Sequence, residues 1–144
     1  MDTIKSISLI LAILGLIYLS VNIILRKKAI GVMNKIGKEN ILLISENANF
    51  FGQESVSMQI RGNGTLVLLK DKLYFELLLP KKVIEIPIER IEGIDETRSH
   101  LGKSVGSKLV KITYRNDKNS LDSCAWLVRN RKDWMDKIKE LIDN

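Results

Sequence analysis

A basic stretch rich in glycine and serine, RSHLGKSVGSK at residues 98–108, has the residue types from which proteins build phosphate sites. Arginine, lysine and serine side chains can donate hydrogen bonds to phosphate oxygens, and glycines let a ligand approach the backbone closely. The residues of this stretch that could bind an anion or a lipid headgroup are Arg98, His100, Lys103, Ser104 and Lys108.

The Gly102-Lys103-Ser104 triplet does not make this stretch a nucleotide-binding P-loop. That motif, G-x-x-x-x-G-K-[ST], needs a glycine five residues before Gly102, where the sequence has Thr97. The residues that follow, SVGSKLVKITYR, have a strand pattern, whereas a P-loop leads into a helix. Two interpretations stay open: a site for an anionic headgroup, and a solvated connection between strands, which is the commoner role of a charged loop.

The other reactive side chains do not form a catalytic or metal-binding set. His100 is the only histidine, and both a metal site and a histidine-assisted nucleophile need companions. Cys124 lies within a strand pattern beside Trp126, so we expect a small core residue, not a nucleophile. We therefore expect that the protein is not an enzyme and uses no metal or cofactor.

An uncharged run of twenty residues, SISLILAILGLIYLSVNIIL at 6–25, predicts a membrane-spanning helix. At 1.5 Å per residue such a helix spans about 30 Å, the thickness of a bilayer hydrocarbon core. A cleaved signal peptide would have several basic residues before a shorter apolar run and a small-residue cleavage site after it. Here only Lys5 precedes the run and ILRKK ends it, so we expect an uncleaved transmembrane helix at residues 4–26.

The flanking charges predict how this helix is oriented. Asp2 and Lys5 cancel before the run, whereas Arg26, Lys27 and Lys28 follow it directly. The positive-inside rule then places the N-terminus outside and the C-terminal domain in the cytoplasm of a single-pass protein of the cell membrane. A lone cysteine suits that reducing compartment. The same basic cluster can also attract anionic lipid.

The distribution of charge argues against a nucleic-acid partner. The chain has a formal net charge of +6, but residues 41–144 hold 17 basic and 15 acidic side chains. The excess of positive charge therefore lies next to the predicted membrane helix and is not spread over the domain.

The rest of the chain predicts a β domain that ends in a helix. Residues 27–49 have a mixed pattern, which we interpret as a partly helical juxtamembrane linker, and residues 50–144 form the domain. Short strand patterns occur at 55–61, 65–70, 73–79, 83–88, 91–96, 108–115 and 122–129. The Asn63-Gly64 pair predicts a hairpin turn after the first of them. No room is left for crossover helices, so the sheet must be antiparallel.

The last segment predicts an amphipathic helix. Trp134, Ile138 and Leu141 recur at helical spacing, and Asn130 is placed to cap the N-terminus. Such a helix can close the open end of a bent sheet and cover its edge.

Seven strands followed by one helix resemble the pleckstrin-homology-like (PH-like) superfold, and more closely its GRAM-type and prokaryotic PH-like domains. The segments that carry the resemblance are GNGTLVLLKDKLYFE (62–76), EIPIERIEGI (85–94) and AWLVRNRKDWMDKIKEL (125–141). The resemblance implies a partly open, seven-stranded antiparallel barrel capped by the C-terminal helix. In lipid-binding members, basic residues around the first hairpin bind the headgroup, and here that region offers only Arg61.

Together these observations predict a single-pass membrane protein that holds a PH-like binding or scaffolding module at the cytoplasmic face, where it recruits a protein partner. A spanning helix already secures membrane localisation, so lipid affinity is not needed for targeting. The alternative is a sensor of anionic lipid headgroups that uses the basic stretch 98–108. The superfold hosts both kinds of binding, so the fold alone does not decide between them.

Overall fold

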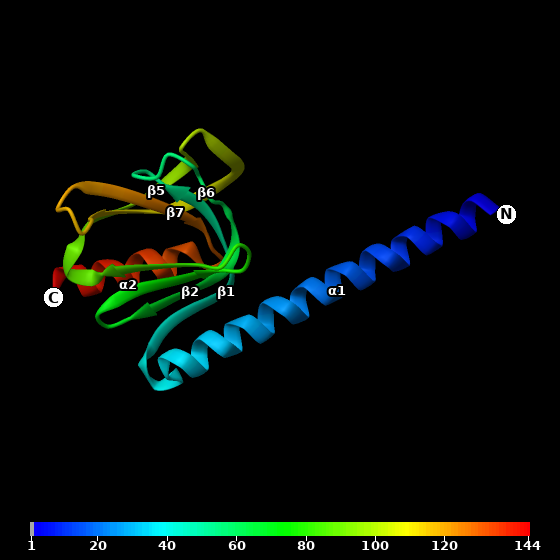
Figure 1. Cartoon of the computed structure of the whole chain (residues 1–144), viewed down its shortest axis with the longest axis horizontal. Coiled ribbons are helices and arrows are strands. Elements are labelled where there is room, and N and C mark those ends of the chain that lie inside the picture. The colour runs from blue at the N-terminus through cyan, green and yellow to red at the C-terminus, as the bar shows by residue number, and fades with distance from the viewer. Residues whose placement is uncertain (1) are drawn as a thin grey trace.

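A long apolar helix, α1 (Asp2–Ile36), begins the described part of the chain, which is residues 2–144 of the computed structural model. Its N-terminal portion extends far from the other elements (Figure 1). The segment Thr3–Ile36 is long and apolar enough to cross a membrane, and the rest of the chain buries none of its apolar window. The predicted helix is present, and it continues through much of the segment that the sequence suggested was a linker.

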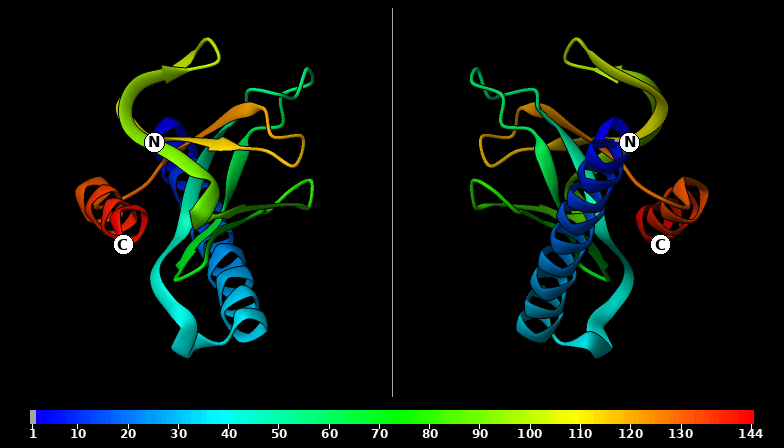
Figure 2. Two further views of the ribbon diagram at one scale, coloured as in Figure 1. Left: turned by 90° about the vertical axis from the view of Figure 1, so that its left-hand side faces the viewer. Right: turned by 90° about the vertical axis from the view of Figure 1, so that its right-hand side faces the viewer.

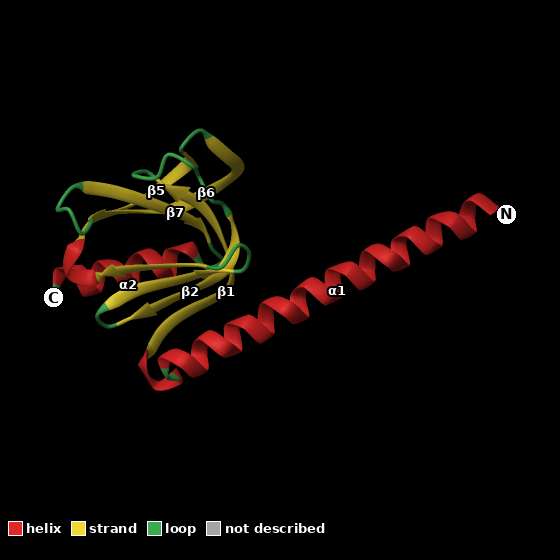
Figure 3. Cartoon of the chain, in the orientation of Figure 1, coloured by secondary structure: helices red, strands yellow, loops and turns green. Residues whose placement is uncertain are grey.

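Seven antiparallel strands and a second helix follow (Figure 3). The elements are β1 (Ile41–Gln53), β2 (Gly62–Leu69), β3 (Lys72–Leu77), β4 (Lys82–Pro87), β5 (Ile91–His100), β6 (Lys103–Arg115), β7 (Leu121–Leu127) and α2 (Arg131–Asp143). The strand order β4-β3-β2-β1-β7-β6-β5 makes one sheet, which curls into a half-barrel around α2 (Figures 1 and 2). The predicted fold class, an N-terminal helix, a seven-stranded antiparallel barrel and a C-terminal helix, is confirmed.

The position predicted for the first strand is wrong. Residues 55–61 form a loop, and residues 41–53 form β1. Asn63 and Gly64, which were expected to turn the chain, lie in β2, where Asn63 pairs with Asn49 and Gly64 pairs with Ala48. A side chain at Gly64 would clash with the ring of Phe75. The glycine is therefore required by the close approach of β3, not by a turn.

The core lies between the concave face of the sheet and α2. The rings of Phe50, Phe75 and Trp126 pack together with centroids 5.2–5.7 Å apart. Trp134 and Ile138 of α2 are buried against them, as the helical spacing predicted. Asn130 precedes α2 as expected, but its side chain makes no capping hydrogen bond.

The C-terminal part of α1 packs on the convex face of the sheet. Val32 lies in a buried cluster with Val67, Leu69 and Tyr74 of β2 and β3. Lys28 Nζ donates to the carbonyl oxygens of Leu77 (2.6 Å) and Leu78 (3.0 Å). These contacts attach the helix to the β domain along its last turns.

The same contacts fix the direction in which α1 leaves the domain. Lys35 Nζ lies 3.4 Å from the hydroxyl of Tyr74, in the middle of β3, whereas Lys28 reaches the end of β3. Traced back from Ile36 towards its N-terminus, α1 therefore runs from the middle of β3 towards the β3–β4 turn. The apolar part of the helix leaves the domain at that side (Figure 1).

Candidate functional site

The basic stretch 98–108 forms the end of the β5–β6 hairpin. β5 continues to His100 and β6 begins at Lys103, and these two residues pair across the ladder. Between them, Leu101 and Gly102 have positive φ angles of 49° and 76°. Positive φ at both central positions matches the twist of an antiparallel hairpin. The stretch joins strand to strand, so it lacks the strand-to-helix geometry of a P-loop.

The five residues of this stretch that were predicted to bind an anion have different surroundings. Arg98, Lys103, Ser104 and Lys108 are exposed, and His100 is buried. Lys108 Nζ donates to Glu96 (2.7 Å), which also accepts from Arg131 (2.6 Å). Hydrogen bonds from Lys108 and Arg131 lower the pKa of Glu96 to about 2. The charge of Lys108 is thus paired within the protein.

Two basic side chains of the hairpin remain for an external anion. Lys103 is exposed, and its Nζ lies 5.9 Å from the centre of the Phe51 ring. The exposed Arg98 side chain has no ion-pair partner among residues 2–144. Ser104 Oγ accepts a long hydrogen bond of 3.4 Å from the backbone of Gly106. The hairpin therefore keeps the charges of Arg98 and Lys103 exposed, whereas Ser104, the next residue of β6 after Lys103, points to the opposite face of the ladder.

His100 is not available to an external anion. Its ring is only 5% exposed, and among the described residues Nε2 has no hydrogen-bond partner. Burial lowers the pKa of His100, and the positive charges of Lys111 and Arg61 add to this. A backbone hydrogen bond with Gly52 and the charge of Glu54 act in the opposite direction. His100 is a buried ring and does not face an external anion.

The three residues of the juxtamembrane basic cluster, Arg26, Lys27 and Lys28, also differ in their surroundings. Lys28 points to the domain, where its ammonium also lies 3.9 Å from the buried carboxylate of Glu76. Arg26 and Lys27 are exposed, and Arg26 lies 3.9 Å from Glu46 of β1. Only Arg26 and Lys27 keep charges on the surface.

The buried polar groups around Cys124 serve to fasten a loop. Asp122 accepts from the backbone and hydroxyl of Ser55 (2.9 and 2.5 Å) and from Gln53 (2.8 Å). The hydroxyl of Tyr114 lies 3.1 Å from Asp122 and 3.8 Å from Cys124 Sγ. Burial raises the pKa of Cys124 to about 12, so the thiol stays protonated and is a poor nucleophile. Among residues 2–144, no group of three or more His, Cys, Asp or Glu side chains is arranged to hold a metal ion.

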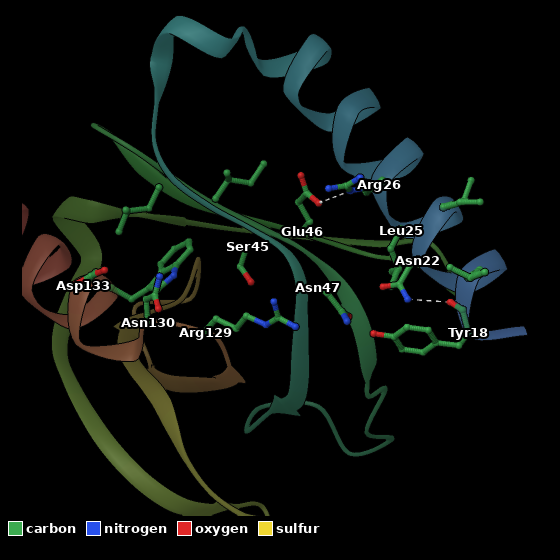
Figure 4. A pocket seen from close by; sticks show the side chains of 15 residues that line it. Tyr18, Asn22, Leu25, Arg26, Ser45, Glu46, Asn47, Arg129, Asn130 and Asp133 are labelled. Carbon is green, nitrogen blue, oxygen red and sulfur yellow. Dashed lines mark hydrogen bonds and ion pairs between the residues drawn. The ribbon is translucent and has the colours of Figure 1, made fainter. Parts of the chain in front are cut away.

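A cleft of about 700 Å³ opens between α1, β1 and the start of α2 (Figure 4). Tyr18, Asn22 and Arg26 line it from α1, residues 43–47 line it from β1, and Arg129, Asn130, Asp133 and Trp134 line it at the entry to α2. Its charged groups have both signs: the Arg26–Glu46 pair lies on one side, and Arg129 and Asp133 lie on the other (Figure 4). In the described chain, the side chain of Arg129 has no ion-pair partner and is exposed.

The cleft exists because two neighbouring strands separate. β1 pairs with β2 from Ile41 to Phe50, but it pairs with β7 only from Asn49 to Gln53. β7 ends at Leu127 and the chain turns into α2, so residues 41–48 of β1 have no described strand on that side. A free strand edge presents unpaired backbone N–H and C=O groups.

The sequence indicated neither this edge nor the residues around it. Leu43–Asn47 fell in the predicted linker, Arg129 ended the last predicted strand (122–129), and Asp133 fell in the predicted C-terminal helix. The apolar and polar residues of ILLISENANF could have signalled a strand there, but two register irregularities, at Ile41–Leu43 and Ser45–Ala48, interrupt the alternation.

Comparisons with known proteins identify the fold only. No family model and no curated protein sequence matches the chain. Its structure is similar to a chain of the 8S snRNP assembly intermediate, with a TM-score of 0.51 and 10% identity over 72% of this chain and 80% of that one. It is also similar to the C-terminal domain of an unknown protein from Leishmania infantum, with a TM-score of 0.52 and 14% identity over 86% of this chain and 99% of that one. Vav1 bound to an allosteric inhibitor gives a TM-score of 0.48 at 10% identity, over 71% of this chain and 26% of that one.

Proposed function

We propose that the protein is a single-pass, membrane-anchored binding module with a PH-like domain, which recruits a protein partner at the cytoplasmic face of the cell membrane. The length and exposure of the apolar part of α1 support the anchor. The basic residues that follow it support the cytoplasmic location of the domain. The curled seven-stranded sheet with its C-terminal helix supports the PH-like assignment, of which GRAM-type domains are one form.

The free edge of β1 in the cleft is the observation that carries the proposed recruitment of a partner. An extended peptide segment can add to such an edge as a further strand, with backbone hydrogen bonds supplying affinity. Leu43 offers an apolar contact to the added strand, and Arg129 and Asp133 offer charged ones. Tyr18 and Asn22, which line the cleft, lie within the uncharged run of α1, so an occupant would reach into the interface of the bilayer.

The alternative, sensing of anionic headgroups by the hairpin 98–108, has less support. Lys108 is paired with Glu96 and His100 is buried, so two of the five residues expected to bind the headgroup are already engaged or enclosed. Each surface-proximal basic residue contributes about 1 kcal/mol to attraction by an anionic membrane, which makes Arg98 and Lys103 a weak site by themselves.

Site-specific photocrosslinking in intact cells tests recruitment through the cleft. A photoreactive residue at Asn47, which is exposed in the cleft, should give a discrete adduct with another protein. Arg129→Glu should weaken that adduct about tenfold, because arginine contacts are often dominant in protein interfaces. The control Lys118→Glu, on the exposed β6–β7 turn, should leave the adduct unchanged.

The same photoreactive residue at Lys118 should give no discrete adduct. Recruitment through the cleft is refuted if position 47 gives no adduct, or if Arg129→Glu and Lys118→Glu have equal effects.

A further inference from the structure

Exposed apolar side chains occur in three connections of the β domain, and two of these connections lie on the side from which α1 extends. Leu79 in the β3–β4 turn is 82% exposed, and Met58 in the β1–β2 loop is 80% exposed. Val105 and Leu101 are exposed on the β5–β6 hairpin. The β3–β4 turn and this hairpin both lie on the side towards which the apolar part of α1 extends (Figure 1). Arg61 connects the loop to the hairpin by donating to the carbonyl oxygen of Leu101 (3.0 Å).

The contacts of α1 place the β3–β4 turn near the end of the apolar run. Lys28 binds the carbonyl oxygens of Leu77 and Leu78, directly before Leu79. The uncharged run of α1 ends at Leu25, less than one helical turn away from Lys28. A bilayer spanned by that run would have its interface at this level. In such a bilayer, Leu79 would lie at the depth where headgroups meet acyl chains.

The charges around these apolar residues suit a membrane surface. The turn 78–82 and the hairpin 98–108 contain five basic residues, Lys81, Lys82, Arg98, Lys103 and Lys108, and no acidic residue. Another exposed apolar residue, Leu121, lies in a different setting: it follows the β6–β7 turn, where Asp117 and Asp122 are its acidic neighbours. Basic residues around exposed apolar ones are typical of surfaces that lie in a bilayer interface.

We propose that the β3–β4 turn and the β5–β6 hairpin rest in the interface of the bilayer that α1 enters. Leu79 and Val105 insert among the headgroups, and Lys81, Arg98 and Lys103 lie at the level of the phosphates. The partner of this surface is the lipid bilayer itself, and the contact does not require a pocket that binds one kind of headgroup. This inference rests on the membrane anchor of the proposed function but not on the cleft.

Fluorescence of the full-length protein in lipid nanodiscs tests this contact. An environment-sensitive dye is attached to Leu79→Cys or Val105→Cys, with Leu121→Cys as the matched exposed control. The native Cys124 is fully buried, so the unsubstituted chain serves as the labelling blank. Spin-labelled lipids should quench the dye at 79 and 105 at least about twofold more than at 121, and labels near the headgroup should quench more than labels deep in the acyl region.

Both neutral and anionic bilayers should give this result, because apolar insertion does not require lipid charge. Equal quenching at positions 79 and 121 would contradict the proposal. A dye at 79 that is shielded from water but not quenched by lipid would show that a protein covers the turn, which also overturns it. Quenching that occurs only with anionic lipid would indicate headgroup binding in place of insertion. The crosslink at Asn47 reports separately on the cleft, so failure of the two proposals can be distinguished.

Discussion

Basic side chains near the predicted membrane surface divide into two groups by their partners. Lys28 and Lys108 are bound within the protein, to the end of β3 and to Glu96. Arg98, Lys103 and Lys27 keep exposed charges. Residue type and spacing revealed which side chains could bind an anion, but not which of them already have an internal partner. Those partners lie far away in sequence, so only the folded chain brings them together.

His100 is the one histidine of the chain, and its burial gives a pH-dependent stability. Because burial lowers its pKa in the folded state, the unfolded chain binds the proton more readily. Its contribution is present above the unfolded pKa of about 6.5 and is lost as the pH falls below it. Lys111 and Arg61 strengthen this effect, and Glu54 weakens it.

We therefore expect His100→Leu to flatten the fall in unfolding free energy between about pH 7.5 and pH 5.5. Chemical denaturation of the full chain in detergent at both pH values measures the difference. Ser104→Ala, on the same hairpin but exposed, is the control and should keep the wild-type slope. An unchanged slope in His100→Leu would mean that His100 is protonated as easily in the folded state as in the unfolded chain.

At the scale of elements, the sequence predicted the strands in which inward-facing and outward-facing residues alternate regularly. It did not predict β1. Ile84, Ile86 and Ile88 all lie in the core cluster, and so do Cys124 and Trp126. β1 was missed because two irregularities shift its inward and outward positions.

The loop 55–61 alternates like a strand but does not pair as one. The side chain of Gln59 accepts a hydrogen bond from the backbone N–H of Gln53 (3.0 Å) and donates one to the backbone carbonyl of Gln53 (2.8 Å). Asp122 binds the backbone of Ser55. These side chain–backbone bonds take the place of a strand ladder, and they depend on residues that a local pattern does not include.

The junction of α1 with the sheet depends on Lys28, whose side chain is 18% exposed. Lys28→Met would keep most of the apolar stem but would remove the donor to Leu77 and Leu78 and the cation beside Glu76. We expect this to destabilise the junction by about 1.5–3 kcal/mol, the range for hydrogen bonds to charged groups. Faster hydrogen exchange in residues 29–36 would report the loss.

Lys27→Met is the matched control for Lys28→Met, because the neighbouring Lys27 is exposed. It should leave exchange in residues 29–36 unchanged. Equal exchange in both variants would show that apolar packing around Val32 holds the helix without help from Lys28.

For the whole molecule, the attachment of α1 to the sheet has a direct functional consequence. The candidate anchor and the β domain are connected without a flexible linker, because Val32 and Lys28 pack on β2 and β3. A spanning α1 would therefore hold the domain in one orientation at the membrane. The cleft would then open beside the bilayer, where an extended segment of a second membrane-associated protein can reach it.

Membrane topology is the central claim of this account, and cysteine labelling in intact cells tests it most directly. Thr3→Cys lies at the N-terminal end of α1 and Ser120→Cys on the exposed β6–β7 turn, while the native Cys124 is buried. A membrane-impermeant thiol reagent should label position 3 in intact cells, and position 120 only after the membrane is permeabilised. Labelling of position 120 but not of position 3 in intact cells would contradict a cytoplasmic binding module.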